Sequence, residues 1–144
     1  MPYDPQLVQP MREELSRVGV QELTSQEQVE SFMAESSGTA LLIVNSVCGC
    51  AAGGARPAIS IAMQHENCPN RVASVFAGQD VEATEKARSY FAEFPPSSPC
   101  FVLFKDGKVV HFVPRHGIEG RDPQSIAFDL VSTFDTHCTA KAER

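Results

Sequence analysis

The sequence predicts an α/β fold in three layers, with a mixed β-sheet between two layers of helices. A continuous apolar run at 39–44 has the length of a strand that is buried on both faces. Two further apolar runs, 100–104 and 109–113, flank Lys105-Asp106-Gly107-Lys108, which is a strong signal for a β-hairpin. Segments with apolar residues at helical spacing separate these runs, so we expect helices to cover the sheet.

The composition is that of one globular domain spanning 1–144, with a tail expected to fray at about 139–144. Of the 144 residues, 42% are hydrophobic and 21% are charged, which excludes a disordered chain. The net charge of −6 offers no basic surface for nucleic acid or an anionic membrane. There is no apolar run of membrane-spanning length and no signal-peptide pattern, so we expect a cytoplasmic protein.

Two helices are expected before the first long strand. Asp4-Pro5 has the form of an N-cap followed by proline, and apolar residues then repeat at helical spacing as far as Gly19. Thr24-Ser25-Gln26-Glu27 is a capping-box pattern, and Gly38 is the expected end of that helix. The link at 20–23 is expected to add an edge strand.

The later elements complete a recognisable order. We expect a helix at about 51–64 kinked by Pro57, a strand at 71–76, a helix from Asp80 to about Phe94, the hairpin, and a last helix from Asp122-Pro123. A βαβ unit followed by a ββα unit is the order of the thioredoxin-like α/β/α sandwich, here with an extra N-terminal helix. That topology puts residues 48–50 at the carboxyl end of a strand, where open α/β sheets usually carry their sites.

Cys48-Gly49-Cys50 is therefore the candidate active site. A helix N-terminus stabilises a thiolate, and we predict Cys48 to be the more exposed sulfur and the attacking one. Gly49 allows a tight backbone and leaves room for a second protein's sulfur. A disulfide across one residue closes a small, strained ring, which favours mixed disulfides at Cys48 with Cys50 helping release.

Other polar residues are expected at the same edge of the sheet. The Ser98-Pro99 bond should be cis and face the cysteine turn, where its backbone groups can pair with a substrate chain. Arg115 and His116 follow the second hairpin strand and could hold an anionic small thiol or favour a thiolate. These two residues are equally compatible with a solvated loop.

The cysteine motif has three alternatives to a redox role. The cysteines could be buried, inert thiols. They could bind zinc or a cluster with Cys100, Cys138 or a histidine, but no second close pair of such ligands exists, so we predict no metal. A phosphate-binding loop is excluded, because Ala55-Arg56 stands where Lys-Ser/Thr is required.

Several stretches together resemble the bacilliredoxins, and the resemblance spans about Leu7 to Cys138. They are Asn45-Ser-Val-Cys-Gly-Cys-Ala-Ala-Gly53, Phe76-Ala-Gly-Gln-Asp80, Pro96-Ser-Ser-Pro99, Val110-His-Phe-Val-Pro-Arg-His116, Ile118-Glu-Gly120 and Phe134-Asp-Thr-His-Cys138. The resemblance implies a thioredoxin-like fold and removal of bacillithiol from protein mixed disulfides, with weak disulfide isomerase-like activity. Cys48 would then take the bacillithiol and Cys50 would be the possible resolving thiol.

The resemblance also implies partners. These are S-thiolated client proteins and bacillithiol as a co-substrate, with no other cofactor. A homodimer is a separate hypothesis. Other hypotheses are a protein disulfide isomerase or reductase, a metal- or cluster-binding module using Cys48 and Cys50, and a non-catalytic thioredoxin-like interaction domain.

Two residues depart from the expected pattern. Cys100 follows Pro99 where the family is expected to have serine, so a third thiol is predicted beside the site, in contact with substrate, as an alternative resolving thiol or as a passive substitution. Leu42 stands six residues before Cys48, where thioredoxins carry a buried aspartate. The missing acid weakens a general dithiol-reductase role.

Overall fold

A five-stranded mixed sheet in the order β1-β3-β2-β4-β5 forms the middle layer of residues 2–139, which are those that the computed structural model describes. Its strands are β1 (Gln21–Glu22), β2 (Thr39–Asn45), β3 (Arg71–Phe76), β4 (Cys100–Lys105) and β5 (Lys108–Val113). β1, β3 and β2 run parallel, whereas β4 is antiparallel to both β2 and β5. The tail predicted to fray lies, from residue 140 on, outside the described residues.

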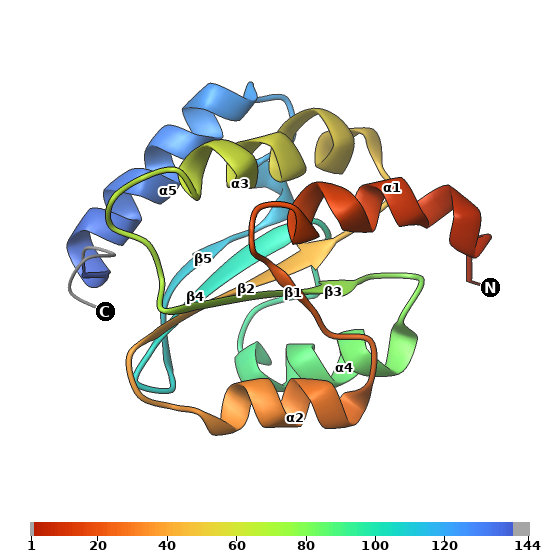
Figure 1. Cartoon of the computed structure of the whole chain (residues 1–144), viewed down its shortest axis with the longest axis horizontal. Coiled ribbons are helices and arrows are strands. Elements are labelled where there is room, and N and C mark those ends of the chain that lie inside the picture. The colour runs from red at the N-terminus through yellow and green to blue at the C-terminus, as the bar shows by residue number, and fades with distance from the viewer. Residues whose placement is uncertain (1, 140–144) are drawn as a thin grey trace.

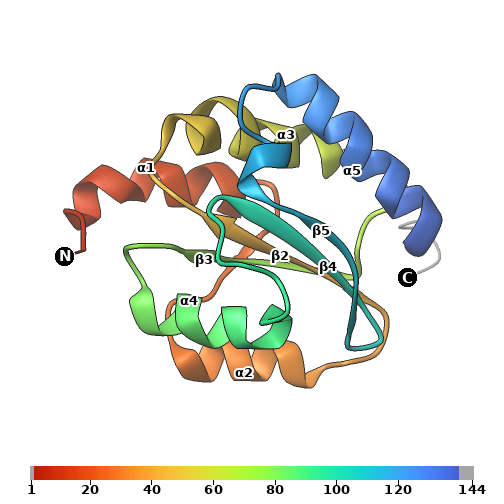
Figure 2. The ribbon, with the colours of Figure 1, turned by 180° about the vertical axis from the view of Figure 1, so that it is seen from behind.

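Helices cover both faces of this sheet (Figures 1 and 2). Helices α1 (Pro5–Ser16), α3 (Arg56–Ala62) and α5 (Pro123–His137) lie on one face, and α2 (Gln26–Ala34) and α4 (Val81–Arg88) lie on the other. The predicted three-layer α/β/α arrangement with an extra N-terminal helix is confirmed. The edge strand predicted at 20–23 is also present, as β1.

Each face of the sheet has its own apolar core. β2 is buried throughout and contributes to both, because successive side chains of a strand point to opposite faces. Leu41 and Ile43 pack with Ile59 and Phe134 in the first cluster, under α1, α3 and α5. The second cluster lies between the sheet and helices α2 and α4, and it contains Ala40, Leu42, Val44, Phe91, Cys100 and Val102.

Helix starts and turns follow the sequence signals, with small shifts at some ends. Asp4 and Asp122 cap α1 and α5 as expected. The N-cap of α2 is Ser25 rather than Thr24, because the Ser25 hydroxyl accepts a hydrogen bond from the Gln28 N–H. In return, Gln28 Oε1 accepts a hydrogen bond from the Thr24 N–H. In the hairpin, Asp106 (φ 51°) and Gly107 (φ 82°) adopt the left-handed conformations of a type I′ turn.

Two helices end earlier than predicted. α2 ends at Ala34, and an irregular link precedes Gly38. α4 ends at Arg88 and tightens into a 3₁₀ turn, Ser89–Phe91, which does not reach Phe94.

The helix after the cysteine turn does not simply kink at Pro57. Residues 51–55 form a π-helical turn, and α3 begins only at Arg56, with Pro57 in its first turn. Proline cannot donate to the helix ladder and collides with the carbonyl four residues before it. The π-helical turn, which is wider than a turn of α-helix, therefore lies directly after the two cysteines.

Two neighbouring glycines in this turn have different surroundings. A Cβ atom on Gly54 would lie 3.3 Å from Ile126 Cδ1 and 3.4 Å from Ile118 Cγ2, whereas one on Gly53 would meet nothing within 4 Å. Gly54 is therefore closely packed against the side chains of Ile118 and Ile126, the latter at the start of α5.

We expect Gly54→Leu to lower the free energy of unfolding by about 1–3 kcal/mol, because the added side chain has no space. Gly53→Leu is the matched control and should leave that free energy unchanged or raise it by up to about 1 kcal/mol, because glycine is a poor helix former. Urea denaturation measures both variants. Equal midpoints for the two would contradict the close packing.

Candidate functional site

Cys48-Gly49-Cys50 lies where β2 ends and the π-helical turn begins. The carbonyl oxygen of Cys48 accepts hydrogen bonds from the N–H groups of Ala51 and Ala52, each at 3.1 Å, so the helical turn starts from Cys48. The aligned N–H groups of such a turn favour negative charge on a nearby sulfur. The fold thus positions both sulfurs where the sequence predicted them.

The two sulfurs are in direct contact. Cys48 Sγ and Cys50 Sγ are 2.7 Å apart as free thiols, and both residues are half-buried, so exposure does not distinguish them as predicted. Burial alone would raise the pKa of Cys48. The hydrogen bonds that its sulfur accepts from Cys50, Ser46 and the backbone of Ala51 have the larger combined effect, so the pKa of Cys48 is lowered. Burial and then the neighbouring Cys48 raise the pKa of Cys50. This arrangement favours a Cys48 thiolate with Cys50 as its protonated hydrogen-bond donor.

Two small neighbours shape the surroundings of Cys48. Ser46 Oγ donates a hydrogen bond to Cys48 Sγ at 3.1 Å and accepts one from the Cys48 N–H at 3.3 Å. Gly49 is exposed, its φ lies outside the left-handed region, and a Cβ atom there would meet nothing within 4 Å. The backbone conformation does not require glycine at this position, so what Gly49 contributes is open space beside the sulfurs.

The loop before β4 forms the other wall of the site. The Ser98-Pro99 bond is cis, as predicted, and Pro99 is buried while Ser98 is half-buried. Ser98 and Cys48 line the same pocket, of about 350 Å³. The other residues lining that pocket are Tyr3, Ser46, Val47, Ala77, Gly78, Arg88 and Arg115.

Two arginines line this pocket. Arg115 donates from Nη1 to the Ser98 carbonyl at 3.4 Å and pairs with Glu119 at 3.1 Å. Arg88 is half-buried and donates to the Ser97 carbonyl at 3.3 Å, but within residues 2–139 it forms no ion pair with a carboxylate. Arg115 follows the second hairpin strand and was predictable from the sequence, whereas Arg88 is brought to the pocket only by the packing of α4.

Comparison with known proteins identifies the family. A model of the disulphide isomerase family matches residues 3–138. A bacilliredoxin of Shouchella clausii is 50% identical over 136 residues, which cover 94% of each chain. One of Salinibacter ruber is 51% identical over 140 residues, covering 96% of this chain and 82% of its own. The chain belongs to the bacilliredoxin family.

Solved structures agree with the fold of this bacilliredoxin-family chain. The thioredoxin of Malassezia sympodialis is 20% identical with a TM-score of 0.55, covering 83% of this chain and 90% of its own. The oxidised thioredoxin of Plasmodium falciparum is 18% identical with a TM-score of 0.56, covering 81% and 98%. These likenesses show the thioredoxin fold, and with the family membership they make the chain a thiol–disulfide oxidoreductase.

Cys100 does not reach the surface of the bacilliredoxin site. It pairs with Val44 across the sheet and is fully buried in the second core cluster. Burial raises the pKa of Cys100 to about 12. The prediction that Cys100 contacts substrate is therefore corrected for this conformation, because the first residue of β4 directs its side chain into the core.

His116, unlike Arg115, does not line the pocket of Cys48. It is exposed on a 3₁₀ turn, Arg115–Gly117, and lines an adjoining pocket of about 500 Å³ with Arg88, Ser98 and Arg115. Cys48 and Cys50 do not line that pocket. Arg115 is thus the predicted basic residue that the fold brings to the pocket of Cys48, while His116 lines the adjoining pocket.

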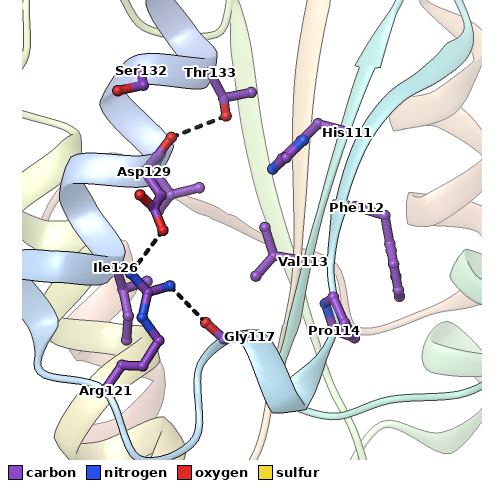
Figure 3. Close-up of a pocket in the computed structure, with 11 residues that line it drawn as sticks. His111, Phe112, Val113, Pro114, Gly117, Arg121, Ile126, Asp129, Ser132 and Thr133 are labelled. Atoms are coloured by element: carbon purple, nitrogen blue, oxygen red, sulfur yellow. Dashed lines mark hydrogen bonds and ion pairs between the residues drawn. The ribbon is translucent and has the colours of Figure 1, made fainter.

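A separate pocket of about 430 Å³ lies between β5 and α5 (Figure 3). His111 and Val113 line it from the strand, and Arg121 and Asp129, which form an ion pair at 2.7 Å, line it from the other side. Burial and then the charge of His137 lower the pKa of His111. No cysteine lines this pocket, so it is distinct from the bacilliredoxin site.

The metal-binding alternative finds no support in the described part of the chain. Within residues 2–139, no three His, Cys, Asp or Glu side chains come together as a group that could hold a metal ion. In the same residues no helix has the length and apolarity needed to cross a membrane.

Proposed function

We propose that this chain removes bacillithiol from protein mixed disulfides, with Cys48 as the attacking thiol. The Cys48 thiolate attacks the bacillithiol sulfur, the mixed disulfide breaks, and the client thiolate leaves and takes up a proton. A new disulfide then joins Cys48 to bacillithiol. In the second step the Cys50 thiol loses its proton and attacks Cys48, which releases bacillithiol and leaves a Cys48–Cys50 disulfide for an external thiol to reduce.

The observation that carries this proposal is the asymmetry of the two cysteines. The pKa of Cys48 is lowered and that of Cys50 is raised, although their sulfurs touch. A thiolate is the attacking species, and a protonated neighbour can both donate a hydrogen bond to it and act later as the resolving thiol. Because this cycle consumes reducing equivalents, we propose that it operates in a reducing compartment, the cytoplasm.

Trapping the intermediate tests the proposal. We expect Cys50→Ser, incubated with a client protein carrying bacillithiol, to gain the mass of bacillithiol less two hydrogens on the peptide that contains Cys48. The Cys48→Ser/Cys50→Ser double variant should gain none. The proposal fails if Cys50→Ser shows no adduct while Cys48 is alkylated at the rate of an ordinary cysteine.

We further propose that the groove beside Cys48 binds the anionic part of the small thiol. Arg115 and Arg88 line the pocket of Cys48, and both also line the adjoining pocket with His116. Arg88 is the strongest candidate, because its half-buried guanidinium has a carbonyl partner and no carboxylate among residues 2–139. Carboxylates are the groups that a guanidinium binds best.

We expect Arg88→Met to raise the KM for a bacillithiolated client about tenfold with little change in kcat, since one charge-assisted hydrogen bond is lost. Lys86→Met is the matched control: it removes the same charge from α4, but Lys86 lies over Tyr90 and does not line the pocket. Steady-state kinetics with both variants measure the difference. Equal KM values would contradict an anion-binding role for Arg88.

Disulfide isomerisation is a second candidate, because the matching family model describes disulphide isomerases. It would use the same Cys48 thiolate against a disulfide between two protein cysteines. Recovery of activity from scrambled ribonuclease measures it. Removal of bacillithiol without such recovery would separate the two functions.

A further inference from the structure

Arg56, behind the cysteine turn, is a buried charged residue that the proposed reaction does not use. It is the first residue of α3, and its side chain is only 2% exposed. Burying a guanidinium costs free energy unless its donors find partners. The partners of Arg56 therefore indicate what its position provides.

Those partners lead toward Cys48. Arg56 Nη1 donates to Asn45 Oδ1 at 3.0 Å and to the Ser46 carbonyl at 2.7 Å. Its other side faces α1, where Nε lies 3.3 Å from Glu14 Oε1. A planar, always charged group of this kind holds two acceptors in a fixed geometry. Arg56 thus ties the last residue of β2 to the residue after it.

Ser46 continues the connection to the sulfur. Its N–H donates to the same Asn45 Oδ1 at 2.9 Å, so the Asn45 amide is held by both Ser46 and Arg56. Its hydroxyl donates to Cys48 Sγ at 3.1 Å. Arg56 is therefore connected to the Ser46 hydroxyl through the Asn45 amide and the backbone of Ser46.

We propose that Arg56 is a positioning residue that fixes the Asn45-Ser46 turn so that the Ser46 hydroxyl points at the Cys48 sulfur. This inference rests on the proposed role of Cys48 as the attacking thiol and adds the buried support that keeps it a thiolate. A hydroxyl held in place needs no reorganisation when the sulfur becomes charged, whereas a free one would turn to water. Arg56 acts through Ser46 and does not touch the substrate.

The test measures the ionisation of Cys48 directly. The full chain is alkylated with iodoacetamide over a range of pH, and peptide mass mapping follows the Cys48 peptide. We expect Arg56→Met to raise the pH midpoint by about half to one unit, which lowers the Cys48 rate below the midpoint about three- to tenfold. Arg56→Lys should recover part of that rate. The other charged or titratable groups that touch the Cys48 sulfur or line its pocket stay in every variant; they are Cys50, Tyr3, Arg88 and Arg115.

A double-variant cycle separates positioning from a general effect of charge. Ser46→Ala alone should give a shift like that of Arg56→Met, and Arg56→Met in the Ser46→Ala background should add little. A full additional shift in that background, or an unchanged midpoint in folded Arg56→Met, would overturn the proposal. If Arg56→Met does not fold, Asn45→Ala takes its place in the cycle, because it removes the acceptor that Arg56 and the Ser46 N–H share.

The outcome is independent of the small thiol. Alkylation reports the Cys48 ionisation whether or not bacillithiol is the physiological substrate. If bacillithiol is not transferred but the midpoint shifts as expected, the proposed function fails and the role of Arg56 stands. If bacillithiol is transferred and the midpoint does not move, the proposed function stands and the role of Arg56 fails.

Discussion

A Cys48→Ser variant is expected to release bacillithiol from a thiolated client at least about a thousandfold more slowly than the parent chain. A serine hydroxyl does not ionise near neutral pH, so the hydrogen bonds from Ser46 and Cys50 would have no anion to stabilise. Cys50 is not expected to replace Cys48, because burial, the largest cause of its raised pKa, remains in the variant. Mass spectrometry of the client over time measures the release.

Cys100→Ala is the control for this loss. Cys100 is also a thiol and directly follows the cis-proline Pro99, but it is fully buried, and burial raises its pKa to about 12. We expect release at close to the parent rate, with about 1 kcal/mol lost from the free energy of unfolding because a small cavity forms. A large fall in rate would show that Cys100 reaches the substrate through a conformation other than the one described.

The fold was predictable because its signals are local. Asp4, Asp122 and the Asp106-Gly107 turn each act within a few residues, and the structure uses all of them. The apolar run of β2 needed only its length and composition to be placed at the centre of the sheet. From those elements the topology rules leave few arrangements, which is why the cysteine turn was placed correctly.

The remainder of the site depends on contacts between distant segments. Arg88 lies 40 residues after Cys48 in the sequence, on a helix whose rotation decides whether it meets the pocket. Which of the two cores Cys100 joins depends on the face of β4 that its side chain takes, and the strand's apolar run does not reveal that face because both faces are covered. Arg56 offered one signal, a charge within an Ala/Gly-rich helix, but its partners at Asn45 and Ser46 are visible only in the structure.

Leu42 also separates this chain from thioredoxins, and its surroundings show what an acid there would cost. Its side chain is fully buried in the second core cluster, under α2 and α4. The helix that follows the cysteines packs against the opposite face, where Ala55, Ala58 and Ile59 belong to the first cluster. An aspartate at position 42 would therefore point away from that helix and into the apolar core under α2 and α4.

We expect Leu42→Asp to lower the free energy of unfolding at pH 7 by at least about 3–5 kcal/mol, because a carboxylate would be buried among apolar side chains. Burial would raise the pKa of this carboxyl in the folded state above its unfolded value of about 3.9. The loss should then grow as the pH rises between those two values, since the unfolded chain gives up the proton first. Leu42→Asn has nearly the same shape without the charge, so urea denaturation at pH 5 and pH 7 should show a pH-dependent loss beyond that of the parent for aspartate and none for asparagine. A loss that is the same for both variants at both pH values would mean that water or a cation reaches position 42.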